Sequence, residues 1–341
     1  MRVLLSFFFI LLLNVFLNAS EVLFQLEDTF KGPFILMNEK YICICDSRLY
    51  RFHTYSRDDF KKIAEFGEKG GGPGEGFVFS RVTLYKDSIY INQYPKLSIF
   101  SIKGELKDEL KGPTDSGRYI PFVRDFVGIK DSNEHSAAEK NKLTFTLFDS
   151  DLEKKKDIFT IEFKNFVRYK GGKWVTLWVR DCFEAVVYDE RLYIGNTDKG
   201  FFFGVFDKKG NKLYEINRDY RKLPITEDYK KWRLDRFRKL AGEERWNRHS
   251  KDTIVFPEYF PAYINFTVSD EKIYVFKHPG KEDQELLILD LNGKLLVSKT
   301  LPLIQGGIYE GNNLCIHGGR LYFVRDNEET EKWDVCFEKI E

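Results

Sequence analysis

Several residue types and patterns that would point to a particular function are scarce in this chain. It has 54 basic and 53 acidic residues, so its formal net charge of +1 gives no overall field that would favour nucleic acid as a partner. Histidine occurs five times, and no two histidines form a His-x-His or His-x-x-x-His pair. The sequence contains no nucleophile elbow, no linked Ser, His and Asp pattern and no metal-spaced cysteine pair. No known catalytic motif is therefore recognisable.

Cysteine is also scarce, with five residues, an odd number. Cys43 and Cys45 lie two apart on one expected strand, where the extended backbone separates their side chains. Cys315 and Cys336 fall on the first and third strands of one unit, about 9.5 Å apart at the usual strand spacing. Cys182 has no obvious partner. We expect buried free thiols and no disulfide.

A long apolar run occurs only at the N-terminus. Val3 to Leu17 is apolar except for Ser6 and Asn14, and small residues follow at 18–20. The run is shorter than the ~18 residues of a membrane span, so residues 1–20 are predicted to be a cleaved signal peptide. An uncleaved anchor is the alternative. We expect the mature chain, 21–341, to be a monomer without a membrane span, located in the periplasm or secreted.

What the chain does have is a repeated segment. This short segment recurs in five copies along the chain. The residues at the fourth position of each copy are Ile42, Tyr90, Tyr193, Tyr274 and Tyr322, and the intervals between them are 48, 103, 81 and 48 residues. A period of about 50 is typical of four-stranded propeller blades. The interval of 103 then contains a degenerate copy, marked by an apolar strand at 143–148, and the interval of 81 contains an insertion of about 30 residues. The sequence thus predicts six units.

Each unit is expected to begin with an inner strand and to continue into strands separated by short polar turns. The expected inner strands are Pro33–Met37, Arg81–Tyr85, Phe183–Tyr188, Ile264–Ser269 and Leu314–His317. In the degenerate third unit the second strand is expected within 133–140. The last unit has only three strands, ending at 333–340, so Val22–Leu26 is predicted to supply its outer strand and close the ring. The fold class is all-β, one six-bladed β-propeller domain over 21–341.

The insertion, at about 225–252, is predicted to contain a helix between blades 4 and 5. Tyr229, Trp232, Phe237 and Leu240 recur at helical intervals, and Thr226 is a suitable N-cap. Much of the remainder is basic, namely Lys230, Lys231, Arg233, Arg236, Arg238 and Lys239. Two interpretations stand: a helix packed across a propeller face with a solvated basic side, or a lid or docking surface for an acidic partner.

A glycine-rich stretch, Gly67 to Phe77, connects the first two units. It lacks the Lys-Ser or Lys-Thr of a phosphate loop, and Glu75 stands where a dinucleotide motif needs its third glycine, so phosphate binding is not expected. A sharp crossover that uses positive φ angles is the structural interpretation.

This stretch, together with the Asp-x-Ile-Tyr-Ile segment that follows it, resembles bacterial six-bladed β-propellers related to NHL repeats and TolB-like propellers. The matching residues are Phe66, Gly67, Gly70, Gly72, Pro73, Gly74, Glu75 and Phe77, with Gly76 as an additional residue. The resemblance implies an exported propeller, commonly of unassigned role, and it transfers no catalytic residue.

Binding residues are expected on the upper face, which carries the outer-to-inner crossovers and the turns between second and third strands. That face should present Gln93, Tyr94, Asn196 and His278. Trp174, Trp178 and Arg180 are either a platform for carbohydrate or peptide or packing residues beside the irregular third unit. His317, Glu184 and Asp125 are further polar residues expected on inner strands, and His317 is the residue to inspect first.

Two functions therefore remain open from the sequence. One is an exported, non-enzymatic scaffold that binds a peptide, protein or glycan on the upper face, with no cofactor. The other is a lactonase-like hydrolase or lyase that uses a calcium or zinc ion in the central channel. Three or more carboxylate, Asn or His side chains at the channel mouth would favour the enzyme, and an apolar or plugged channel would favour the scaffold.

Overall fold

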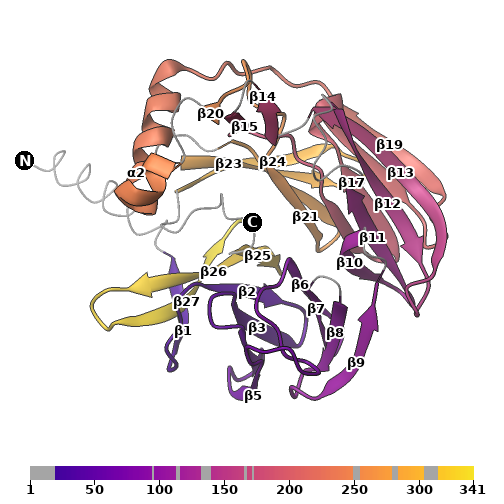
Figure 1. Cartoon of the computed structure of the whole chain (residues 1–341), viewed down its shortest axis with the longest axis vertical. Coiled ribbons are helices and arrows are strands. Elements are labelled where there is room, and N and C mark those ends of the chain that lie inside the picture. The colour runs from indigo at the N-terminus through magenta and orange to yellow at the C-terminus, as the bar shows by residue number, and fades with distance from the viewer. Residues whose placement is uncertain are drawn as a thin grey trace, which may run out of the picture.

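The computed structural model describes residues 20–341 except for 94–95, 113–115, 132–139, 165–166, 171–172, 249–253, 279–282 and 303–313. Within these residues the chain forms six four-stranded antiparallel sheets arranged as a ring, with one helix and a small additional sheet at its side (Figure 1). The predicted six-bladed β-propeller is therefore confirmed.

Each of the first five blades consists of four strands in chain order, from the inner strand outward. Blade 1 comprises β2 (Pro33–Met37), β3 (Tyr41–Asp46), β4 (Arg51–Ser56) and β5 (Lys62–Phe66). Blade 2 comprises β6 (Arg81–Tyr85), β7 (Ser88–Gln93), β8 (Lys96–Ser101) and β9 (Leu106–Lys111). Blade 3 comprises β10 (Ser116–Phe122), β11 (Asp125–Asp131), β12 (Lys140–Phe148) and β13 (Lys154–Lys164). Blade 4 comprises β16 (Ala185–Tyr188), β17 (Arg191–Gly195), β18 (Phe201–Phe206) and β19 (Lys212–Arg218). Blade 5 comprises β21 (Asn265–Ser269), β22 (Lys272–Phe276), β23 (Asp283–Asp290) and β24 (Leu295–Pro302).

Blade 6 joins the two ends of the chain, as predicted. Its order is β25 (Leu314–His317), β26 (Arg320–Asn327), β27 (Lys332–Lys339) and then β1 (Glu21–Leu26). β1 pairs antiparallel with β27, and Figure 1 shows the indigo first strand beside the yellow last strand. Because the outer strand of blade 6 precedes blade 1, the N-terminal segment connects the last blade to the first. This closure leaves the ring without a gap between its ends.

The expected inner strands agree with the structure to within two residues, but the prediction for the second strand of blade 3 is wrong. That strand is β11, directly after the inner strand, whereas 133–139 lies outside the described residues. The hairpin turns through only Val123 and Arg124, with Phe122 paired to Asp125 and Val123 at a φ of 64°. Neither turn residue is the Asn or Gly that such a turn usually carries, so no turn could be recognised at this position. Asp125 is consequently on a second strand, not on an inner one.

The core lies between neighbouring blades, where one face of each sheet packs against the next. Between blades 3 and 4, Val127 and Phe145 pack in one cluster with Leu192 and Phe206, and all four are buried. Burial of a side chain of this size stabilises a fold by about 1.5–3 kcal/mol relative to exposure. Repeated at each blade boundary, such packing makes the ring a rigid frame for its channel.

The cysteines are free thiols, as expected. Cys43 and Cys45 have sulfur atoms 3.5 Å apart on β3, and Cys315 and Cys336 are separated by the whole of β26. Four of the five are buried, and Cys315 is partly buried.

The insertion forms α2 (Glu227–Arg248), with a non-helical glycine at 242. Thr226 caps it, since its hydroxyl oxygen accepts a hydrogen bond of 3.2 Å from the backbone N–H of Tyr229. Beside α2 lies a three-stranded sheet of β14 (Val167–Lys170), β15 (Lys173–Leu177) and β20 (Ile254–Val255). β15 and β20 are parallel, so the segments that flank blade 4 are joined at one side of the ring. We call α2 and this small sheet the cap.

Candidate functional site

A cavity of about 1520 Å³ occupies the centre of the ring, and we call it the channel. Its wall is formed by the inner strands of all six blades, β2, β6, β10, β16, β21 and β25. The upper end of the channel is the end at which the inner strands begin, and the lower end carries the turns into the second strands. Between the ends the wall is of mixed character, since aliphatic and hydroxyl side chains line it together: Leu36, Leu84 and Val186 with Thr83, Thr267 and Ser269.

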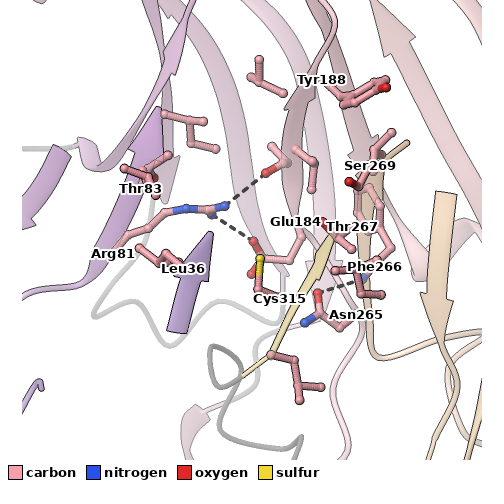
Figure 2. Close-up of a pocket in the computed structure, with 18 of the residues that line it drawn as sticks. Leu36, Arg81, Thr83, Glu184, Tyr188, Asn265, Phe266, Thr267, Ser269 and Cys315 are labelled. Carbon is pink, nitrogen blue, oxygen red and sulfur yellow. Dashed lines mark hydrogen bonds and ion pairs between the residues drawn. The ribbon is translucent and has the colours of Figure 1, made fainter. Parts of the chain in front are cut away.

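Three charged side chains from neighbouring blades meet at the upper end. Glu184 precedes β16, Arg81 begins β6, and Arg118 lies near the beginning of β10. The Glu184 carboxylate is 3.2 Å from Nη1 of Arg81 and 3.8 Å from Nη1 of Arg118. Arg81 also donates through Nη2 to the carbonyl of Ala185 at 3.3 Å (Figure 2). These contacts tie blade 2 to blade 4 across blade 3 and place two guanidinium groups on one carboxylate.

The cap contributes to the wall at the same end. Arg233 and Phe237 of α2 line the channel together with Trp178, which directly follows β15. Trp178 packs edge-on against Phe237 with ring centroids 4.8 Å apart, and the Arg233 guanidinium lies 5.7 Å from the Trp178 ring. The cap is therefore anchored over the upper end by aromatic and cation–π contacts. Trp178 is used in this packing, which supports the packing interpretation of this aromatic cluster.

His278 belongs to the same region and lines the channel. Its ring packs against Phe260 at 4.4 Å between centroids, and Tyr229 of α2 lies 6.3 Å away. Burial lowers the pKa of His278 to about 3, and the positive charges of Arg233 and Lys277 act in the same direction. At neutral pH this imidazole is therefore uncharged.

His317 lines the channel at its lower end, where β25 turns into β26. Desolvation and the charge of Arg57 lower the pKa of His317, against an opposing effect of Asp270. The lower end is rich in acidic residues, since five acidic side chains line it together with two lysines: Glu39, Asp87, Asp189, Glu190 and Asp270, with Lys40 and Lys86. The two ends of the channel thus differ in charge.

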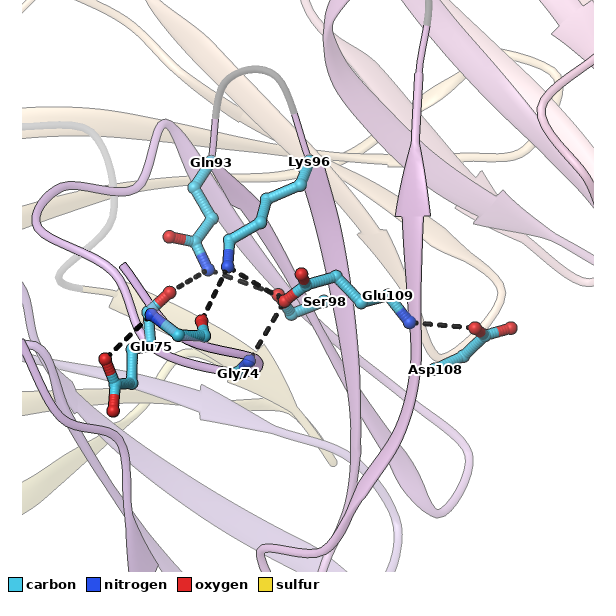
Figure 3. A network of polar contacts seen from close by, with 8 residues as sticks. Gly74, Glu75, Gln93, Lys96, Ser98, Asp108 and Glu109 are labelled. Carbon is cyan, nitrogen blue, oxygen red and sulfur yellow. Dashed lines mark hydrogen bonds and ion pairs between the residues drawn. The ribbon is translucent and has the colours of Figure 1, made fainter. Parts of the chain in front are cut away.

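Gln93 and Asn196 lie on the upper face but do not line the channel. Gln93 is buried and donates to the Glu75 carbonyl at 3.3 Å and to the Ser98 hydroxyl at 3.2 Å (Figure 3). Asn196 is also buried, and its side chain accepts from the Asp198 backbone N–H as the cap of a short 3₁₀ helix, Thr197–Lys199. Both amides therefore hold loops of the scaffold in place.

The glycine-rich junction is held by a network that includes these contacts (Figure 3). Lys96 forms an ion pair of 2.8 Å with Glu109 and donates to the Gly72 carbonyl, while the Gly74 N–H donates to Glu109. Gly67 and Gly74 have positive φ angles of 95° and 73°, as the crossover interpretation requires. A Cβ on Gly76 would lie 1.9 Å from the Gln93 side-chain oxygen, so the additional glycine of this stretch fits tightly against that side chain.

The remaining predicted binding residues are only partly described. Tyr94 and the side chain of Trp174 lie outside the described residues. Arg180 lines the channel and donates through Nε to the Leu177 carbonyl at 3.2 Å. The structure thus places Trp178, Arg180, His278 and His317 on the channel. Arg81 and Arg118 were not among the predicted binding residues. Their position at or near the start of an inner strand was the available signal.

One group of possible metal ligands was found among the described residues, and it lies outside the channel. Ligand atoms of Asp28, His53 and Glu65 are all within 4.8 Å of one another. The Lys62 ammonium lies 2.8 Å from Asp28 and 2.7 Å from Glu65 and lowers the pKa of both carboxyl groups. Two cations, Lys62 and Arg51, the latter 3.4 Å from Glu65, therefore already pair with these two carboxylates. No such group of possible ligands was found among the described residues of the channel, where Glu184 is shared by two guanidinium groups.

Comparison with known proteins shows the fold and no family. No family model matches the chain, and no curated protein matches its sequence. The chain is similar to a solved structure of a Bacteroides fragilis protein predicted to be exported, with 14% identity over 95% of both chains and a TM-score of 0.54. A luciferin-regenerating enzyme matches with 10% identity over 94% of both chains, but the TM-score is 0.42. Within the described residues, no helix is both long and apolar enough to cross a bilayer.

Proposed function

We propose that this chain is an exported, non-enzymatic propeller that binds a peptide, protein or glycan at the upper end of its channel. The observation that carries the proposal is the channel itself, a cavity of about 1520 Å³ lined by aliphatic and polar side chains, with charged side chains at both ends and a cap beside the upper one. A concave cavity that combines apolar surface with converging polar groups is the usual form of a binding site.

Two further observations support a binding role over metal-dependent catalysis. The charged group at the upper end contains one carboxylate and two guanidinium groups, an arrangement that attracts anions and repels cations. The group of metal-ligating side chains found among the described residues is Asp28, His53 and Glu65, away from the channel. Export is supported by the apolar run at 3–17, whose length fits a signal peptide. We further propose that the mature chain acts as a monomer and binds no nucleic acid.

Selection of ligands from a displayed random-peptide library and from a glycan array tests this proposal. The mature protein is compared with Thr83→Trp and Thr267→Trp, which fill the channel from β6 and β21, two of its inner strands. Leu213→Trp is the matched control, because Leu213 is 49% exposed on the outer strand of blade 4.

We expect selected ligands to bind the wild type and the control equally and to lose at least about tenfold in affinity with the filled channels, a change of about 1.4 kcal/mol. Melting curves verify that the variants are folded. Equal binding by the filled variants, or no ligand from either library, would refute the proposal. Stoichiometric calcium or zinc in the purified protein together with metal-dependent lactone hydrolysis would replace it with the enzymatic function.

A further inference from the structure

The charged group at the upper end has more positive than negative charge. Arg81, Arg118 and Glu184 together carry a net charge of +1, and Arg180 and Arg233 line the same part of the channel, together with Asp181. The three side chains of the group are 24%, 38% and 35% exposed, respectively, so they remain accessible from the lumen. A net positive charge on a partly buried wall attracts an anion more strongly than it would in bulk water.

Arg118 is the less engaged of the two guanidinium groups. Its ion pair with Glu184, at 3.8 Å, is its only polar contact with the described residues, whereas Arg81 makes a shorter ion pair and a hydrogen bond to a backbone carbonyl. A guanidinium group has five N–H donors in a planar fork that matches a carboxylate. Arg118 therefore retains donors for a ligand. Glu184 and Arg81, whose contact is drawn in Figure 2, hold the arrangement together.

The channel below these arginines constrains the remainder of such a ligand. Aliphatic side chains such as Leu36, Leu84 and Val186 line the middle of the wall beside polar side chains, and five residues of strand span about 16 Å. Its lower end is acidic, with five carboxylates against two lysines. An anionic group is thus attracted to the upper end and repelled from the lower end, so a ligand with one anionic end would bind in one orientation.

We infer that Arg118, assisted by Arg81, binds the carboxylate of a ligand whose apolar body lies along the channel wall. The inference rests on the proposed binding function and gives the ligand a chemical class. One carboxylate balances the net charge of +1 that these three mutually paired side chains carry. A fatty or aryl-alkyl acid and a peptide with an apolar C-terminal residue both carry this group.

Calorimetric titration of the mature protein tests the inference with matched probes. Octanoate and 4-phenylbutyrate are compared with octanamide and octyl phosphate, and a hexapeptide pool ending in Leu is compared with the same pool amidated at its C-terminus. The carboxylate-bearing probes are expected to bind and their amides to bind at least about tenfold more weakly, since a hydrogen bond to a charged group contributes about 1.5–3 kcal/mol. The free acids and the peptide pool distinguish the two sources of the carboxylate.

Two variants locate the site. Arg118→Gln removes the less engaged guanidinium and should weaken carboxylate binding by about 10- to 150-fold. Lys86→Gln removes one positive charge from the lower end of the same channel and should leave the affinity within about twofold, because screening over that distance is strong. Arg118→Gln is preferred to a change at Arg81, since Arg81 also pairs with Glu184 at 3.2 Å and supports the wall.

Equal affinity for octanoate and octanamide, tighter binding of octyl phosphate, unchanged affinity in Arg118→Gln, or no binding of any carboxylate probe would each overturn the inference. The proposed binding function can survive these results. A ligand selected from the peptide library or the glycan array that lacks a carboxylate and is excluded by Thr83→Trp would sustain the binding propeller and remove the carboxylate site.

Discussion

Because β1 closes the ring, we predict that its buried side chain Leu26 contributes strongly to the stability of the fold. This residue is fully buried at the end of β1, in a cluster with Phe30, Ile42, Tyr55 and Val335. The cluster combines residues of blade 6, blade 1 and the segment between them, so Leu26 contributes to the junction between the two ends of the chain. Replacing a fully buried Leu by Ala typically costs about 2–5 kcal/mol through lost burial and the cavity that remains.

We expect Leu26→Ala to lower the free energy of unfolding by about 3 kcal/mol. Val22→Ala is the matched control, because Val22 lies on the same strand and is 51% exposed, and it should cost less than about 0.5 kcal/mol. Urea denaturation followed by tryptophan fluorescence measures both. With an m value of about 3 kcal/mol per molar, the Leu26→Ala midpoint should fall by about 1 M while m is unchanged.

Two outcomes would show that this reasoning is wrong. If the Leu26→Ala midpoint lies within about 0.2 M of the wild type, then β1 does not stabilise the closed ring to the degree that its burial indicates. If Val22→Ala is as costly as Leu26→Ala, burial in the cluster does not explain how β1 stabilises the ring.

Two further predictions follow from other parts of the ring. The pKa of His278 is about 3 in the folded chain, and its ordinary value is about 6.5. Between about pH 6.5 and pH 3 the imidazole is therefore protonated only in the unfolded chain. The free energy of unfolding should consequently fall with acidification by up to about 1.4 kcal/mol per pH unit. Urea midpoints from pH 7.5 to 4.5 should show this additional slope in the wild type and not in His278→Gln, and parallel profiles would contradict it. Glu271 is exposed and has a φ of 60° in the turn between β21 and β22, so Glu271→Gly should stabilise the fold by about 0.5 kcal/mol. Glu271→Ala, which keeps the left-handed strain, should give no such gain by calorimetry, and an equal gain in both variants would refute the explanation.

Much of the fold could be predicted from the sequence because each blade repeats a local pattern. The five recognised copies each produce a second strand, and the strand before each copy is the inner strand, as for Arg81–Tyr85 and β6. Alternation between apolar and polar residues suffices for such strands. Blade 3 was harder, because its hairpin turn at Val123 and Arg124 carries no Gly or Asn, and the turn is stabilised by the strands on either side.

The candidate site could be predicted only in part. His278 and His317 were expected to be of interest and both line the channel, but at opposite ends of it. Gln93 and Asn196 were expected to bind a ligand, and the structure shows them buried and hydrogen-bonded within the scaffold. A polar residue on a loop can serve either purpose, and a single sequence does not distinguish them.

By itself, the sequence determined the number of blades, the helical insertion and the strand that closes the ring. These features follow from local periodicity, capping and the count of strands, which are written in neighbouring residues. Only the tertiary structure brought Arg81, Arg118 and Glu184 together, although up to 103 positions separate them in the chain. Such a contact depends on how six blades are placed around one axis, and no local pattern encodes the distance between side chains on different blades.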